Sequence, residues 1–75
     1  MLYYKKNNTT FYKLIPESKT FTEVFTSPEQ CRIMNVQNEV LYSNTAGRVF
    51  QHQFEEATEA EFTTALQQAL ERLGA

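Results

Sequence analysis

The last third of the chain carries the pattern that most constrains its fold, an amphipathic helix that begins after Thr58 and ends at Gly74. Thr58 and Glu61 have the spacing of a capping box, in which each side chain accepts a hydrogen bond from the other residue's backbone N–H. Apolar residues then recur at the spacing of one buried stripe. The stripe consists of Phe62, Ala65, Leu66, Ala69, Leu70 and Leu73. A helix this short is unstable alone in water, so we expect the whole stripe to pack on the rest of the chain.

The first 26 residues predict three β-strands. Leu2–Lys6 and Thr9–Ile15 flank Asn7-Asn8, and asparagine tolerates the positive φ that tight hairpin turns require. Pro16 has no N–H to donate to a sheet and therefore ends the second strand. Residues Thr20–Thr26 are rich in β-branched and aromatic side chains, which favours a strand, although their apolar spacing also fits one helical turn.

The middle of the chain predicts a short helical turn followed by a second hairpin. Ser27–Gln30 has a serine cap and a proline at the first helical position, which is typical of a helix start. Arg32–Val36 and Glu39–Ser43 are then interpreted as two strands joined at Gln37-Asn38.

A last predicted strand precedes the C-terminal helix. Asn44–Gly47 contains a glycine and is expected to form a turn, after which Arg48–Glu55 alternates between apolar and polar residues. In this strand Phe50, His52 and Phe54 would share one face. The expected fold is thus one α+β domain spanning residues 1–75, an antiparallel β-meander of about five to six short strands packed by one C-terminal amphipathic helix.

Charge is distributed unevenly along a chain whose net charge is only -2. Residues 1–20 carry four lysines and one glutamate, whereas residues 49–75 carry five glutamates and one arginine. Solvated faces and the acidic first turn of a helix explain this pattern in the simplest way. The alternative is that the basic and acidic ends dock on one another between copies of the chain.

Cysteine usage and hydropathy predict a cytoplasmic protein, or one assembled into something made in the cytoplasm. The single cysteine, Cys31, excludes an intrachain disulfide and favours a reducing compartment. The apolar start at Leu2 meets Lys5 and Lys6 at once, so we expect no secretory segment, and no apolar run has the length of a membrane span.

No residue pattern predicts catalysis, a cofactor or a metal. Cys31 and His52 are the only cysteine and histidine, and the chain has no aspartate to complete a triad. Two such residues are too few for a zinc site within one chain. Gly47 and Gly74 are the only glycines, so no phosphate-binding glycine loop is present. We therefore expect no enzymatic activity and no small-molecule substrate.

The N-terminal hairpin is the candidate interaction surface, because aromatic and lysine side chains alternate along it. Rings on a strand can stack bases while lysines contact phosphates, as in proteins that bind single-stranded nucleic acid. The simpler explanation is that tyrosine suits a half-exposed strand and lysine protects a sheet edge. The candidate residues are Tyr3, Tyr4, Lys5, Lys6, Tyr12 and Lys13.

The layout of short Tyr/Lys/Thr strands, followed by Glu56-Ala57-Thr58-Glu59-Ala60-Glu61-Phe62 and a Leu/Ala helix, resembles small uncharacterised proteins of bacteria and their tailed phages. In topology, strands capped by a helix are also similar to single-strand-binding transcription coactivators and Whirly-type proteins. The expected function is a non-enzymatic protein-protein interaction or structural accessory protein that binds itself or another protein. The resemblance to phage proteins implies that it could be assembled into a virion. The alternative is a single-stranded nucleic-acid-binding module that uses the hairpin.

Overall fold

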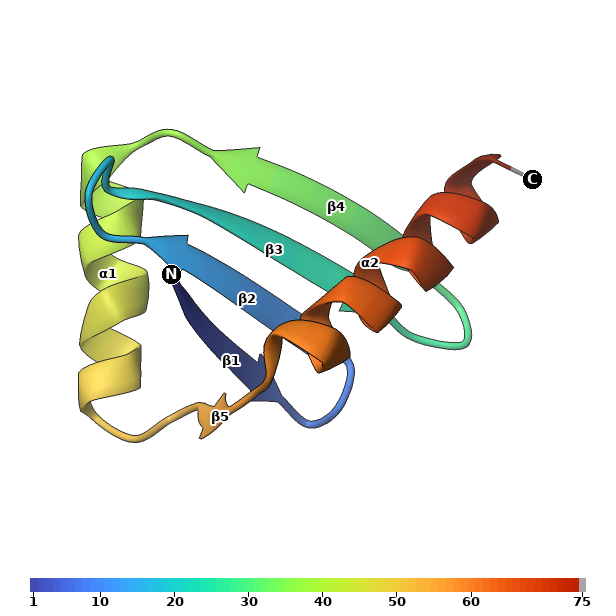
Figure 1. Cartoon of the computed structure of the whole chain (residues 1–75), viewed down its shortest axis with the longest axis horizontal. Helices are drawn as coiled ribbons and strands as arrows, with labels where there is room; N and C mark the ends of the chain where they lie inside the picture. Colours follow the sequence, from blue (N-terminus) through green and yellow to red (C-terminus); the bar gives the residue numbers. More distant parts are fainter. Residues whose placement is uncertain (75) are drawn as a thin grey trace.

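The computed structural model describes residues 1–74, which form a five-stranded sheet and two helices. The strands are all antiparallel to their neighbours and lie in the order β4-β3-β2-β1-β5 (Figure 1). The elements are β1 (Leu2–Lys6), β2 (Thr10–Ile15), β3 (Thr20–Thr26), β4 (Cys31–Val36), α1 (Glu39–Phe50), β5 (Glu55–Glu56) and α2 (Glu59–Gly74). The predicted α+β fold, with an antiparallel meander and a packed C-terminal helix, is confirmed.

The three N-terminal strands form where the sequence predicts them. Asn7 and Asn8 have φ angles of 56° and 57°, and the backbone N–H of Thr9 donates to the carbonyl of Lys6 at 3.2 Å. Both asparagines therefore adopt the left-handed conformation that a tight hairpin turn needs. Residues Thr20–Thr26 are a strand, which excludes their helical alternative.

The expected helical turn at Ser27–Gln30 is wrong, because these residues form the hairpin turn between β3 and β4. The N–H of Ser27 donates to the carbonyl of Gln30 at 2.8 Å, and the N–H of Gln30 donates to Ser27 Oγ at 3.0 Å. The serine satisfies a backbone N–H as a helix cap would, but β4 begins immediately afterwards at Cys31.

The second predicted hairpin is wrong in its second half: Arg32–Val36 lies in β4 as predicted, but Glu39–Ser43 belongs to helix α1. Asn38, expected in a hairpin turn, is instead the helix cap: its backbone is extended, and its side chain accepts the N–H of Leu41 at 3.1 Å. Tyr42, Ala46 and Val49 pack against the sheet at helical spacing. Gly47 lies within the helix and not in a turn.

The predicted strand at residues 48–55 is wrong, because only its last residue, Glu55, lies in a strand, the two-residue β5. Helix α1 continues to Phe50, whose side chain is 86% exposed, and His52 follows with a φ of 60°. Phe54 is buried, whereas His52 is exposed, so the three side chains do not share a buried strand face. The apparent alternation therefore spans a helix end, a turn and a short strand.

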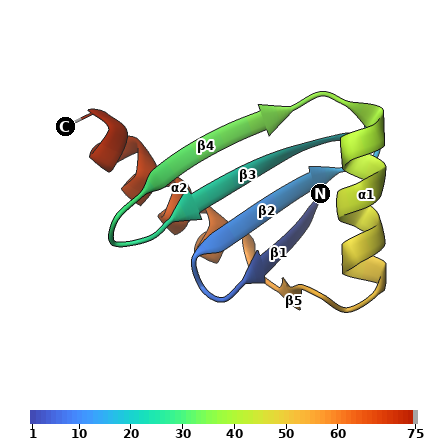
Figure 2. The same ribbon diagram turned by 180° about the vertical axis from the view of Figure 1, so that it is seen from behind.

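The two helices cover opposite faces of the sheet, as the two views show (Figure 2). We call these faces the α1 face and the α2 face. Because strand residues alternate between faces, each face has its own core. The α1 face is centred on Tyr12, Leu14, Phe21 and Phe54. The α2 face is centred on Val24, Phe62, Ala65 and Ala69.

Helix α2 buries only part of its predicted stripe. Phe62, Ala65 and Ala69 are buried, but Leu70 and Leu73 are each 55% exposed, so the expectation that the whole stripe is buried is wrong. The helix starts over β1 and reaches β4 at Ala69, and its C-terminal turn extends beyond that strand (Figure 1). The last leucines consequently have no strand of this chain beneath them.

Candidate interaction surfaces

The N-terminal hairpin does not present its six candidate residues on one face. Because the sheet is pleated, Tyr3, Lys5 and Lys13 lie on the α2 face, and the other three candidates lie on the α1 face. The register places Tyr3 opposite Lys13 and Tyr4 opposite Tyr12. The hairpin therefore divides its aromatic and basic side chains between two faces.

The tyrosines of the hairpin pack in or against the two hydrophobic cores. Tyr12 is 7% exposed and stacks on Phe54, with 4.6 Å between ring centroids. Tyr3 packs against Phe62 of α2 at 5.7 Å between centroids. Burial, the largest contribution, and the nearby Glu23 carboxylate raise the pKa of Tyr12. The Tyr12 ring is buried and the Tyr3 ring is partly covered by α2, so both are poorly placed to stack on bases.

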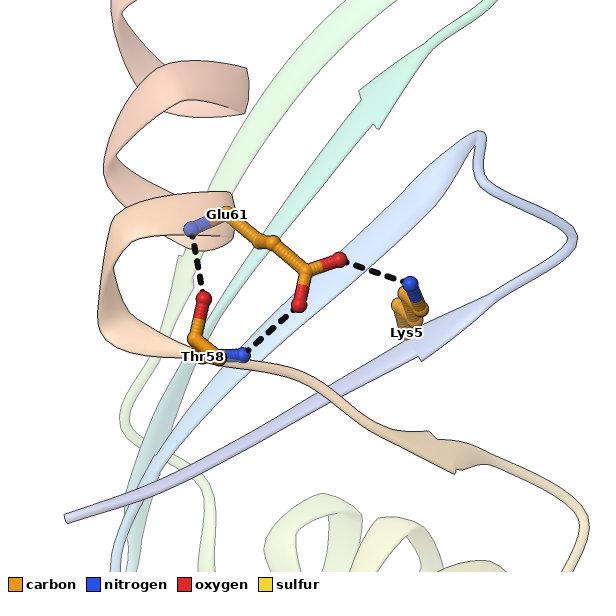
Figure 3. Close-up of polar contacts among 3 residues, drawn as sticks. All are labelled: Lys5, Thr58 and Glu61. Atoms are coloured by element: carbon orange, nitrogen blue, oxygen red, sulfur yellow. Dashed lines mark hydrogen bonds and ion pairs between the residues drawn. The ribbon is translucent and has the colours of Figure 1, made fainter.

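Lys5 forms an ion pair with Glu61 at the start of α2 (Figure 3). Lys5 Nζ donates to Glu61 Oε2 at 2.6 Å, while Oε1 accepts the N–H of Thr58 at 3.1 Å. The N–H of Glu61 donates to Thr58 Oγ1 at 3.1 Å, which confirms the predicted capping box. The hydrogen bond from Lys5 is the main reason that the pKa of Glu61 is lowered, and the same bond raises the pKa of Lys5.

Two lysines of the basic end form ion pairs within one molecule, and one of these pairs joins the basic end to the acidic end. Lys5 pairs with Glu61, and Lys19 pairs with Glu39 of α1 at 2.7 Å. Two of the four N-terminal lysines are therefore neutralised by carboxylates of the same chain. This weakens the continuous positive field that binding to nucleic-acid phosphates requires.

An open groove of about 360 Å³ lies beside the first half of α2. Phe11 and Ala65 form its apolar part, and Asn8, Thr64 and Gln68 line its polar rim. Glu61 at its margin is already held by Lys5 and Thr58. The groove has a mixed polar and apolar lining and no unpartnered charged side chain that specifies a ligand.

Cys31 and His52 lie near opposite edges of the sheet. Cys31 is half-buried under α2, with its Sγ 3.6 Å from the carbonyl oxygen of Ala69. His52 is exposed and follows α1, on the side where β5 joins β1. The structure thus does not bring the two together. Within residues 1–74, no three His, Cys, Asp or Glu side chains are grouped so that they could hold a metal.

The two edges of the sheet differ in length and charge. The edge strand β5 has two residues, Glu55 and Glu56, and both are exposed. Short, charged edge strands resist pairing with another chain. The other edge strand, β4, has six residues with the sequence Cys31-Arg32-Ile33-Met34-Asn35-Val36 and contains neither proline nor lysine. Only β4 therefore has the length and composition of an unprotected edge.

The alternation of hydrogen-bonded residue pairs along the β3–β4 hairpin shows which backbone groups of β4 face outward. Ser27 and Gln30 are a hydrogen-bonded pair at the turn, and such pairs alternate along an antiparallel ladder. Arg32, Met34 and Val36 therefore direct their backbone groups toward β3. The N–H and C=O groups of Cys31, Ile33 and Asn35 point away from the sheet, and we call this set the β4 edge.

Comparisons with known proteins leave function open. No family model, no curated protein and no solved structure matches the chain. The resemblance to small phage and bacterial proteins therefore stays a hypothesis. No helix among residues 1–74 is both long and apolar enough to cross a membrane.

Proposed function

We propose that this chain is a non-enzymatic protein-protein interaction module that associates with itself through the β4 edge. The single observation that carries the proposal is the contrast between the two edges of the sheet. A six-residue edge with free N–H and C=O groups pairs with another strand unless something protects it. The resemblance to small phage proteins adds the hypothesis that the module is a structural accessory component.

Self-association through charge alone has less support. Two of the four N-terminal lysines are already paired within one chain, Lys5 with Glu61 and Lys19 with Glu39, which leaves fewer charges to join two copies. Backbone pairing at the β4 edge does not depend on those charges. We therefore expect association that changes little with salt, since screening acts on exposed charges.

The nucleic-acid alternative also has less support, because the rings of Tyr3 and Tyr12 pack in the two cores. A salt-sensitive mobility shift with a single-stranded oligonucleotide would favour this alternative over self-association. Lysine–phosphate contacts release counterions, so such binding must weaken steeply as salt rises.

Sedimentation equilibrium tests the proposal, with Asn35→Pro as the informative variant. Proline removes the outward N–H of Asn35 and leaves the β3–β4 ladder intact, since edge strands tolerate proline where the N–H faces away from the sheet. Asn35→Ala is the matched control, because it removes the same side chain, including its hydrogen bond with Thr22, and keeps the N–H.

We expect the wild type and Asn35→Ala to show a dimer or larger mass at high micromolar concentration, and Asn35→Pro to remain a monomer. A monomeric wild type at that concentration and low salt contradicts self-association. A dimeric Asn35→Pro with an unchanged circular dichroism spectrum shows that association uses another surface.

A further inference from the structure

We propose that the partner at the β4 edge is a second copy of the chain, related by a two-fold axis that passes between the two Ile33 residues. This inference rests on the proposed function and adds the symmetry axis and the strand register of the dimer. The two sheets would join into one antiparallel sheet of ten strands, with both α2 helices on the same face.

The backbone of β4 limits the possible registers. A two-fold axis perpendicular to the sheet makes β4 antiparallel to its copy and keeps each face on its own side. Directly opposed residues must lie on the same face, so a residue can oppose itself or one that is two or four positions away. With Ile33 opposite itself, Cys31 opposes Asn35, and all three residues of the β4 edge form hydrogen-bonded pairs. An axis at Met34 leaves Cys31 outside the strand pairing.

The charges of β4 are compatible with a second copy in this register. Arg32 is the only charged residue of the strand, and it opposes Met34 of the second copy. Its guanidinium lies 3.2 Å from Glu23 of its own chain and 5.6 Å from the centre of the Phe25 ring. No like charges are directly opposed. At the β5 edge, by contrast, any self-pairing brings carboxylates together.

Helix α2 places an apolar flank beside the proposed axis. Arg72 projects toward the β3–β4 turn, where it donates to the carbonyl of Ser27 at 2.6 Å. At 100° per residue, Leu66, Leu70 and Leu73 project from the opposite side of the helix, toward the axis. We call these three residues the leucine flank. The flanks of the two helices would face one another above the Ile33 pair and cover the exposed parts of Leu70 and Leu73.

The size of this surface sets the expected strength of the dimer. A standard interface buries about 800 Å² on each partner and uses about 20–30 residues. The six residues of β4 and the three of the leucine flank are fewer than half that number, which corresponds to the small, transient class of interfaces. We therefore expect a dissociation constant in the micromolar range.

Disulfide trapping with Asn35→Cys tests the register. In the proposed dimer the new cysteine opposes Cys31 of the second copy as a hydrogen-bonded pair, with about 5.5 Å between Cα atoms, which a disulfide can span. Within one chain the same two positions are about 13 Å apart along a strand, so an intrachain disulfide is excluded. Diamide oxidation should give a covalent dimer that thiol reagents reverse. Asn35→Cys with Cys31→Ser is the matched control and should give none.

A second cysteine variant separates the two possible axes. Met34→Cys with Cys31→Ser places cysteines opposite one another only if the axis lies at Met34. If this variant crosslinks and Asn35→Cys does not, the proposed register is overturned, but self-association through β4 stands. If the wild type sediments as a dimer and neither variant crosslinks, pairing of β4 about either axis is excluded and the proposed register is overturned. A wild-type monomer overturns the proposed function itself.

The leucine flank is tested by Leu70→Glu, with Gln67→Glu on the outer face of the same helix as the control. Because Leu70 is half exposed in the monomer, the variant should fold, but two carboxylates would face one another across the axis. We expect dimerisation to weaken at least about tenfold for Leu70→Glu, as for like charges in an interface, and to be unchanged for Gln67→Glu. Equal dimerisation constants for the two variants contradict the placement of the helices.

Discussion

Replacement of Gly47 by alanine tests directly whether residues 39–50 are a helix. Gly47 lies within α1, has no positive φ, and a Cβ built on it would meet no atom within 4 Å. Nothing in the structure requires glycine there, and alanine is the better helix former by about 0.5–1 kcal/mol. If residues 44–47 formed the turn that the sequence suggests, with a positive φ at Gly47, alanine would instead destabilise the fold. The sign of the change therefore distinguishes the two structures.

Thermal unfolding monitored by circular dichroism measures this effect. In a domain of this size, 1 kcal/mol shifts the unfolding temperature by about 4–8 °C, so Gly47→Ala should raise it by roughly 2–8 °C. Gly74→Ala at the end of α2 is the control, and it should have a smaller effect because terminal helical residues fray. A lower unfolding temperature for Gly47→Ala would refute the helical assignment.

Three further predictions concern the cores and the capping box. Leu14→Ala should cost about 2–5 kcal/mol in chemical denaturation because Leu14 is 1% exposed, whereas Leu70→Ala should cost about 1 kcal/mol or less at concentrations where the chain is monomeric; equal losses would contradict the assigned burial. Thr58→Ala should cost about 1 kcal/mol, and Thr63→Ala on the exposed face of α2 almost nothing, so equal melting curves would argue against the cap. The pKa of Glu61 is lowered in the folded state, so the ionised carboxylate stabilises the fold at pH values above its ordinary pKa of 4.5, and this contribution is lost as pH falls through the folded-state pKa. The difference in unfolding free energy between wild type and Glu61→Gln should therefore shrink from about pH 6 to about pH 3. A difference that stays constant over this range would contradict the ion pair.

The parts of the fold with strong local signals were predictable from the sequence. Asn7 and Asn8 specify the first turn by their tolerance of positive φ, and Thr58 with Glu61 specifies the start of α2. These signals depend on residues close together in the chain. The turn and the helix start that they specify therefore do not depend on how the rest of the chain packs.

Helix α1 was missed because its sequence fits two periods. Residues 48–55 alternate between apolar and polar, as a strand with one buried face would, and Gly47 suggests a turn. The helical signal is also present, since Thr45, Ala46 and Val49 follow Tyr42 at offsets of three, four and seven. Packing of Tyr42, Ala46 and Val49 on the α1 face decides between the periods, and that packing is a tertiary contact.

The β4 edge could not be inferred from the sequence for the same reason. Because residues 39–50 form a helix, the chain passes from β4 across the sheet to its other edge. There β5 pairs with β1, and it does not pair with β4. This crossing leaves β4 at the edge. The exposure of Leu70 and Leu73 also depends on it, because no further strand lies beyond β4 under the end of α2.

Amide hydrogen exchange by NMR at two protein concentrations tests the central proposal most directly. The outward N–H groups of Cys31, Ile33 and Asn35 should exchange fast in dilute solution and become protected at high micromolar concentration. The N–H groups of Arg32, Met34 and Val36 already bond to β3 and should change less. Protection of the first three that rises with concentration is the predicted result. Fast exchange of the same three amides at every concentration would contradict self-association through the β4 edge.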